Sequence, residues 1–187
     1  MILKQNFFNR SALEVAPELL GKFLVRKHKG KTIVGMIREV EAYNGPFDKA
    51  SHASKGRTPR TEIMFGPPGY FYIYLCYGFH WMLNVITGEE GYPAAILIRS
   101  VQYLEAELPN IEGPGRVTKF FGIDGKLNGK SAFAQGYSET KLVLPENGLW
   151  FEDRGDEFSM KIKRAPRIGV ASAGRVWSKK PYRFFVD

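Results

Sequence analysis

The chain has 187 residues, a single cysteine and a formal net charge of +8, from 27 Lys and Arg against 19 Asp and Glu. This length suffices for one domain with a sizeable core, and one cysteine excludes an internal disulfide and a cysteine-rich metal site. We find no signal-peptide pattern and no membrane-length apolar run, so we expect a cytoplasmic protein. The basic surplus favours a polyanionic partner such as nucleic acid.

The first elements follow from local signals. Ser11 with Glu14 three residues later is a capping-box pattern, which predicts a helix that ends at Gly21. Apolar and β-branched runs then predict strands at residues 23–26 and 32–43, joined by a basic turn. We expect these strands to form a meander at a sheet edge.

The strand at 33–43 carries the most informative acids. Alternation places Ile37, Glu39, Glu41 and Tyr43 on one face. Such a face is either solvated or the floor of a site. A long loop follows at 44–68, and long loops within compact domains are usually functional. Its basic and histidine side chains favour the site, with Glu41 as the general base for water; they are His52, Lys55, Arg57 and Arg60.

Two apolar runs, at residues 70–77 and 79–86, meet at Gly78 and predict a β-hairpin. Alternation directs Tyr74 and Tyr77 to different faces. The tip is apolar where turns are normally polar. Two interpretations remain open here: a hairpin buried in the core, or a wedge of the kind that inserts between DNA base steps.

The sequence after the hairpin predicts further strands and one helix. We predict a strand at 92–101, which contains Arg99, and a helix at 113–122 whose N-terminus suits a phosphate. Short strands are expected at 142–144, 148–151 and 160–164, followed by a sheet-like tail from 167 to 186. There is no internal repeat or domain boundary, so residues 1–187 are expected to form a single domain.

Motifs for nucleotide or metal binding are lacking in the sequence. It has no P-loop, dinucleotide fingerprint or zinc motif. The three histidines, His28, His52 and His80, are too scattered for a local metal motif. Only a metal site assembled from distant loops would remain, and we expect none.

Several segments together resemble the 3-methyladenine, or alkyladenine, DNA glycosylase family. They occur in family order along essentially the whole chain, which makes the resemblance more specific than any one motif. The segments are REVEAYNGPFDKASHASKGRTPR (38–60), MFGPPGYFYIYLCYGFHWMLNV (64–85), LIRS (97–100), GPGRVTKFFGI (113–123), and the C-terminal PRIGVASAG and KKPYRFF.

The resemblance implies a fold and an activity. The fold would be α/β (mixed α+β), with a curved antiparallel sheet, flanking helices and a protruding hairpin, similar to the formyltransferase C-terminal-domain-like fold. The activity would be hydrolysis of the N-glycosidic bond of 3-methyladenine, hypoxanthine or ethenoadenine in duplex DNA, without lyase activity, cofactor or metal. A monomer associated with the nucleoid would suffice.

The resemblance also implies roles for individual residues. Glu41 would activate the attacking water, and Arg99 would help to hold it. The flipped base would stack between Tyr74 on one side and Tyr43 with His52 on the other. Glu41 also suits the chemistry, because a carboxylate stabilises the oxocarbenium-like sugar of such a reaction.

Further residues would handle the DNA. Asn84 would obstruct the amino group of normal guanine, and Tyr77 would occupy the place that the base vacates. Basic side chains would position phosphates without selecting sequence; they are Lys55, Arg57, Arg60, Arg116 and Lys119. No role is carried over to Phe79 or His80.

Two other functions fit the same features. One is a non-catalytic damage-sensing or DNA-bending module that uses the aromatic wedge, which would release no purine. The other is an RNA-binding fold with aromatic platforms, which would prefer single strands. Glu41 together with Arg99 favours the enzyme.

Overall fold

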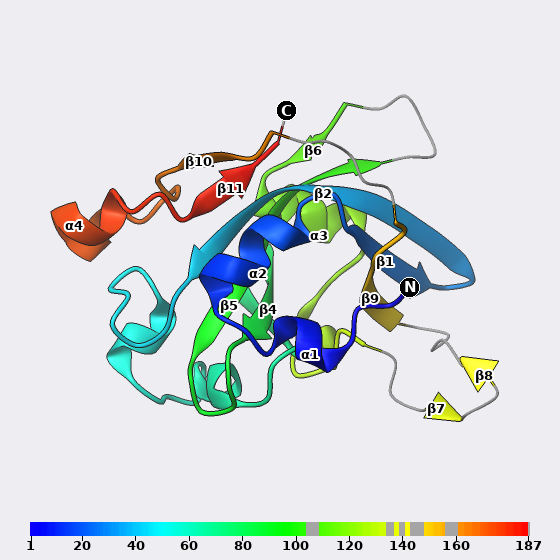
Figure 1. Cartoon of the computed structure of the whole chain (residues 1–187), viewed down its shortest axis with the longest axis horizontal. Coiled ribbons are helices and arrows are strands. Elements are labelled where there is room, and N and C mark those ends of the chain that lie inside the picture. The colour runs from blue at the N-terminus through cyan, green and yellow to red at the C-terminus, as the bar shows by residue number, and fades with distance from the viewer. Residues whose placement is uncertain (104–108, 134–136, 139–140, 143–147, 156–160, 187) are drawn as a thin grey trace.

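The computed structural model describes the chain except for residues 104–108, 134–136, 139–140, 143–147, 156–160 and 187. A nine-stranded antiparallel sheet dominates this part of the chain (Figure 1). A separate two-stranded sheet joins β7 (Tyr137–Ser138) to β8 (Lys141–Leu142). The nine strands are β1 (Phe23–His28), β2 (Lys31–Tyr43), β3 (Phe71–Cys76), β4 (His80–Thr87), β5 (Ala94–Tyr103), β6 (Ile111–Glu112), β9 (Gly148–Glu152), β10 (Lys163–Ala165) and β11 (Arg183–Phe185).

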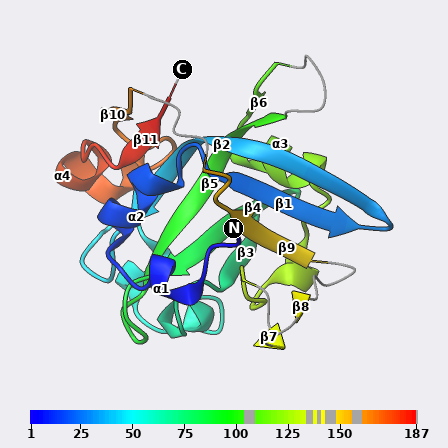
Figure 2. The same cartoon turned by 45° about the vertical axis from the view of Figure 1, so that its right-hand side comes forward.

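The long strand β2 organises this sheet. Its first half pairs with β1, and its second half pairs with β5 on one side and β11 on the other. The strand β9 adds to β1, which Figure 2 shows beside β2. On the far side of β5, β4 and β3 form the predicted hairpin. In this sheet only β5 lies between β2 and the β3–β4 hairpin, so the end of β2 is close to the hairpin.

Ile37 does not lie on the face that simple alternation predicts for it, because β2 contains a bulge. The register with β5 shifts between Ile37 and Val40. Ile37 consequently joins Val40 and Ala42 in the main core instead of sharing a face with Glu39. A bulge adds one residue to a strand and so reverses the alternation on one side of it.

The helices are short and flank the sheet. They are α1 (Gln5–Phe8), α2 (Ala12–Leu19), α3 (Pro114–Phe120) and α4 (Gly174–Ser178), with 3₁₀ turns η1 (His52–Lys55), η2 (Glu62–Phe65), η3 (Gly125–Leu127) and η4 (Ala171–Ala173). The capping box of Ser11 and Glu14 at the start of α2 is confirmed. Within the described ranges, no helix has the length and apolar character needed to cross a membrane.

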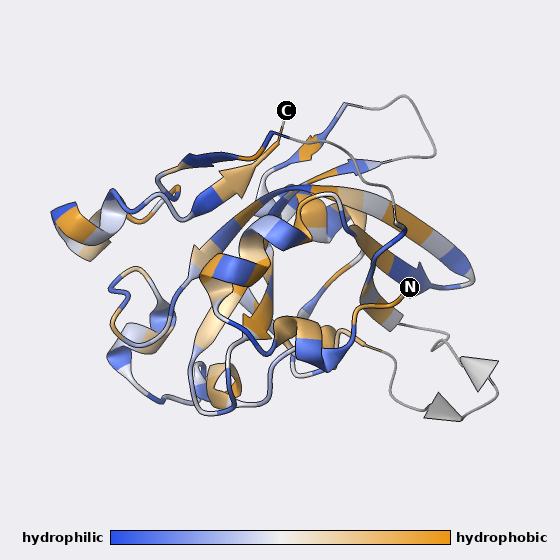
Figure 3. Ribbon diagram, in the orientation of Figure 1, coloured by the Kyte–Doolittle hydropathy of each residue, from blue (hydrophilic) through white to orange (hydrophobic). Residues whose placement is uncertain are grey.

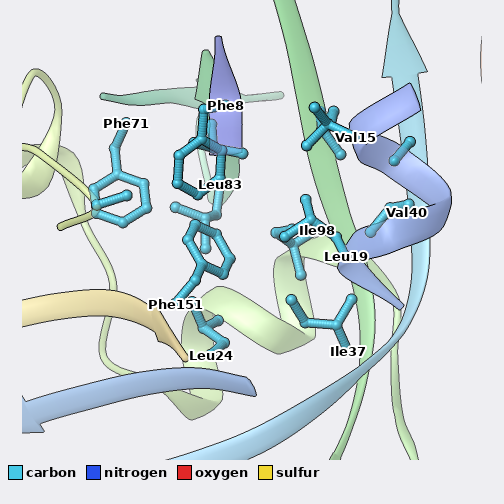
Figure 4. Packing of buried hydrophobic residues seen from close by; sticks show 14 of the residues in the cluster. Phe8, Val15, Leu19, Leu24, Ile37, Val40, Phe71, Leu83, Ile98 and Phe151 are labelled. Atoms are coloured by element: carbon cyan, nitrogen blue, oxygen red, sulfur yellow. The ribbon is translucent and has the colours of Figure 1, made fainter. Parts of the chain in front are cut away.

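The main core lies between the sheet and both α2 and α3. Val15 and Leu19 of α2 belong to the same buried cluster as Val117 of α3. The rings of Phe8 and Phe71 each pack against Phe151, with centroids 5.7 and 5.9 Å apart (Figure 4). Polar and apolar residues alternate along β2 and α2 in Figure 3, as one-sided burial requires.

Most of the predicted elements are present. The helix at α3, the strands β1 to β5 and β9, and the mixed α/β class with its large antiparallel sheet are confirmed. The tail is only partly sheet-like: β11 is a strand, but η4 and α4 are helical, which suits the alanines of 171–173. The predicted strands at 142–144 and 160–164 lie partly outside the described residues.

Candidate active site

A cavity of about 260 Å³ opens where the ends of several strands meet. Its walls come from the end of β2, the loop that contains η1, the hairpin strands β3 and β4, the middle of β5, and residues 168–170 near the C-terminus. Segments that are distant in sequence therefore enclose one space, and the predicted site residues can be located relative to it.

Glu41 lies directly behind the cavity wall. Its side chain is completely buried, and the cavity is lined by three residues that contact it. One carboxylate oxygen accepts a hydrogen bond of 2.8 Å from the backbone nitrogen of Ile168 and lies 3.4 Å from Nη1 of Arg99. The other accepts from the hydroxyl of Tyr43 at 2.9 Å. The acid is thus held by a backbone amide, a cation and a phenol.

The surroundings of Glu41 shift its affinity for protons. Burial raises the pKa of Glu41 above its ordinary value, and the charge of Arg99 with the hydrogen bonds from Ile168 and Tyr43 opposes that rise only in part. A carboxylate with a raised pKa is a stronger base than an exposed one. Each oxygen retains lone-pair capacity for a further donor such as water.

Arg99 is held by two carboxylates. Its Nε donates to Glu39 at 3.1 Å, and Nη1 faces Glu41. Glu39 also accepts from Arg183 at 3.0 Å, which ties β2 to β11. The guanidinium of Arg99 lines the cavity, so the predicted pair Glu41 and Arg99 does come together.

A buried ion pair between Arg167 and Asp48 lies next to Tyr43, one of the residues that hold Glu41. Nη1 and Nη2 of Arg167 both donate to the carboxylate of Asp48, the Nη2 bond at 2.8 Å, and both side chains are fully buried. The guanidinium also donates to the carbonyl of Ala42 at 2.8 Å. It packs 4.8 Å from the ring centroid of Tyr43 and 5.2 Å from that of Tyr182.

This ion pair positions two of the groups that hold Glu41. Arg167 supports the ring of Tyr43, and the next residue, Ile168, presents its amide to Glu41. Asp48 also accepts from the backbone of residues 44 and 50 and so shapes the loop. Neither member of the pair is predicted from the sequence. They lie 119 positions apart, and the presence of Asp48 in the loop after Tyr43 was the only available signal.

Aromatic side chains form another part of the cavity wall. Tyr72 and Tyr74 of β3 both line the cavity, and so does Tyr77, although alternation directs Tyr74 and Tyr77 to different faces. His52 contacts the edge of Tyr74 with ring centroids 4.8 Å apart, and its Nδ1 lies 3.0 Å from the hydroxyl of Tyr72. Burial, then the charges of Arg60 and Lys55, lower the pKa of His52 to about 4. The imidazole is therefore neutral near pH 7.

Asn84 lines the cavity from β4 and is almost fully buried. Its amide nitrogen donates to the carbonyl of Tyr72 at 3.0 Å. This bond fixes the side chain across the hairpin and leaves the amide oxygen as the atom that remains for a ligand.

The hairpin tip is exposed, which excludes the interpretation of a hairpin buried in the core. Tyr77 is 86% exposed and Phe79 is 68% exposed. Tyr77 has a φ of 51°, an uncommon value for an aromatic residue, and Gly78 follows with a φ of 79°. The turn closes with a hydrogen bond from the amide of Phe79 to the carbonyl of Cys76. Since Tyr77 also contributes to the cavity lining, the tip stands beside the cavity mouth.

The five basic residues expected near phosphates are all exposed. Arg57 pairs with Glu62 at 2.7 Å and packs over Phe65. Arg116 and Lys119 lie on α3, whose first residue borders the cavity. Arg60 differs from the others because it lines the cavity, with its guanidinium 4.8 Å from the ring centroid of Tyr74.

Potential metal ligands do not cluster. Among the described residues, no three His, Cys, Asp or Glu side chains gather as a metal site would require. The titratable groups that line or border the cavity are instead the tyrosines, His52, Cys76, two arginines and the buried Glu41.

Comparison with known proteins defines the class. A family model described as methylpurine-DNA glycosylase (MPG) matches residues 6–187. The chain therefore belongs to the methylpurine-DNA glycosylase family, a family of DNA-repair glycosylases, as the sequence resemblance implied.

Curated relatives agree over nearly the full length. A protein of Legionella pneumophila (strain Corby) is 38% identical over 98% of this chain and 93% of its own length. One from Myxococcus xanthus is 41% identical over 98% of this chain and 89% of its own length, and one from Methanocella arvoryzae is 40% identical over 98% of this chain and 92% of its own length. Each carries the name "Putative 3-methyladenine DNA glycosylase".

Proposed function

We propose that this protein removes damaged purines from duplex DNA by hydrolysis of the N-glycosidic bond, leaving an abasic site. The substrates would be 3-methyladenine, hypoxanthine and ethenoadenine. The observation that carries the proposal is Glu41, a buried acid of raised pKa that contacts three residues of the cavity wall. Family membership and the relatives' names support the same class of reaction.

The reaction needs a general base for the attacking water and a charged group that holds this water in place. Water would attack C1′ of the deoxyribose as the bond to N9 breaks, and its proton would pass to Glu41. The negative charge of Glu41 would also stabilise the oxocarbenium-like sugar. Arg99, fixed between Glu39 and Glu41, would hold the water against the cavity wall. General-base assistance of this kind contributes roughly 10²- to 10⁴-fold in rate.

The base would enter the cavity and stack on its aromatic wall. His52 and Tyr74 already touch edge to face at 4.8 Å, so a purine does not fit between these two rings. We therefore place the base between Tyr74 and Tyr43, with His52 at its edge. Asn84, anchored by Tyr72, would meet the 2-amino group of normal guanine and oppose its entry.

The hairpin tip would stabilise the extruded state. Flipping a nucleotide out of a duplex costs a few kcal/mol, and it costs least at damaged or mispaired sites. Tyr77, exposed beside the cavity mouth, would fill the space left in the base stack. The exposed Lys55, Arg57, Arg116 and Lys119 would contact the phosphates on either side.

The cavity lining also bears on the fate of the abasic strand. A lyase step needs an amine that attacks C1′, and no lysine is among the described residues that line the cavity. We therefore propose a monofunctional glycosylase. All of the residues invoked come from one copy of the chain, so a monomer suffices.

One observation favours a second function. Glu41 is completely buried, and a non-catalytic damage-sensing or DNA-bending module would need no solvent access to it. The two functions separate in one assay. Purified protein is incubated, with chelator, with duplexes that carry hypoxanthine, ethenoadenine or 3-methyladenine, and free base and alkali-labile sites are measured. The enzyme releases base and leaves intact abasic strands, whereas lesion binding without any base release would establish the module instead.

A further inference from the structure

The charges on the cavity wall are unbalanced. Only two charged side chains are among the described residues that line it, Arg60 and Arg99, and neither is an acid. Arg99 is compensated by Glu39 and Glu41 behind the wall. Arg60 takes part in no ion pair within the described part of the chain, whereas its neighbour Arg57 is paired with Glu62. The charge of Arg60 is therefore the one positive charge among the described lining residues that no acidic side chain compensates.

The position of this charge is set by Tyr74. The guanidinium of Arg60 stacks 4.8 Å from the centroid of that ring, beside Tyr72 and His52. Its charge reaches across the wall, since it contributes to the lowered pKa of His52. The backbone that carries Arg60 is held independently, by hydrogen bonds of the Thr61 hydroxyl to residues 56 and 58.

The charge matters because damaged purines leave DNA in two electronic forms. When C1′–N9 breaks, both electrons of the bond go to the purine. A neutral base such as hypoxanthine departs as an anion, which later takes a proton from solvent. A base that is already cationic, such as 3-methyladenine in DNA, departs as a neutral molecule. Only the first departure develops negative charge in the cavity, and a fixed cation stabilises such charge in the transition state.

We propose that Arg60 is a specificity-determining residue whose charge stabilises the departing purine and so favours neutral lesions over cationic ones. The inference rests on the proposed function. Arg60 lines the same cavity as the proposed base, and its charge assists hypoxanthine and ethenoadenine while giving no help to 3-methyladenine. This role differs from the phosphate contact that the sequence predicts for Arg60, and the two roles can be separated.

The test compares two lesions in single-turnover reactions with saturating protein. One duplex carries hypoxanthine, and the other carries 3-methyladenine introduced by a methylating agent. Arg60→Gln should slow hypoxanthine release on the order of tenfold or more, and leave 3-methyladenine release within about threefold of the unmodified protein. Arg60→Lys, which keeps the charge, should restore part of the hypoxanthine rate. Both variants should fold, because Arg60 is exposed.

Arg57→Gln is the matched control, since Arg57 is an exposed arginine of the same loop with its own aromatic partner. It should weaken binding of both duplexes equally and lower the salt dependence of binding. If Arg60→Gln behaves in that way, or leaves both rates unchanged, while the unmodified protein is active, the inference is overturned and the proposed function stands. If the unmodified protein releases neither base, the proposed function fails and the inference fails with it.

Discussion

Replacement of Asp48 by Asn tests the buried support beneath the site. The substitution keeps the shape of the side chain but removes the charge that two guanidinium nitrogens of Arg167 contact. Arg167 then remains buried with only backbone carbonyls and two aromatic rings around it. An unpaired buried cation is strongly unfavourable, so the folded state should lose stability.

The size of the effect follows from burial. Loss of one partner from a buried ion pair costs about 3–5 kcal/mol. Asn can still accept a hydrogen bond from Arg167, so we expect the lower end, about 3 kcal/mol. For a chain of this size each kcal/mol lowers Tm by roughly 2–4 °C. The expected fall in Tm is therefore on the order of 6–12 °C.

Glu18→Gln provides the matched control. Arg10 contacts Glu18 through two hydrogen bonds of 2.9 and 2.7 Å, but these side chains are 37% and 49% exposed. An exposed pair contributes about 1 kcal/mol or less, so its loss should lower Tm by under about 4 °C. Thermal and urea unfolding measure both variants. Equal shifts for Asp48→Asn and Glu18→Gln would refute the argument that burial makes the Asp48–Arg167 pair important.

Three further predictions concern the site itself. Tyr77→Ala should lower base release most for well-paired lesions, because the exposed ring no longer fills the vacated stack; equal rates across mispaired and paired duplexes would show that the ring has no such role. The activity should decline as pH falls through the raised pKa of Glu41, beginning above the range of an ordinary glutamate, and a pH profile of single-turnover rates will show whether the decline starts there. The imidazole of His52 should titrate at about 4 in an NMR experiment, and a midpoint near 6.5 would contradict its burial. Because the pKa of His52 is lower in the folded state than in the unfolded state, the neutral imidazole contributes stability at neutral pH. That stability is lost as the pH falls from the pKa of the unfolded state through the pKa of the folded state.

The sequence predicts most of the helices and strands, because apolar runs, turn residues and helix caps are patterns of neighbouring residues. The two apolar runs around Gly78 identified the hairpin that β3 and β4 form. Exposure of the tip was not decided by the sequence, because an apolar turn is compatible with both a buried and an exposed hairpin. Only the packing of the whole chain leaves Tyr77 in solvent.

Long-range features were beyond these patterns. The bulge in β2 arises from its pairing with β5, so simple alternation assigned Ile37 to the wrong face. The Asp48–Arg167 pair joins residues 119 positions apart, and a backbone amide such as that of Ile168 carries no sequence signature at all. The placement of Arg60 over Tyr74 likewise depends on how the loop folds back onto β3.

The most direct measurement is base release by Glu41→Gln beside its binding of the same hypoxanthine duplex. Glutamine matches glutamate in shape and still accepts hydrogen bonds, so the cavity wall of Tyr43, Arg99 and Ile168 should persist. We expect lesion binding to stay within about threefold and single-turnover release to fall by roughly 10²-fold or more. Release of hypoxanthine by this variant at the unmodified rate would contradict the assignment of Glu41 as the base that activates water.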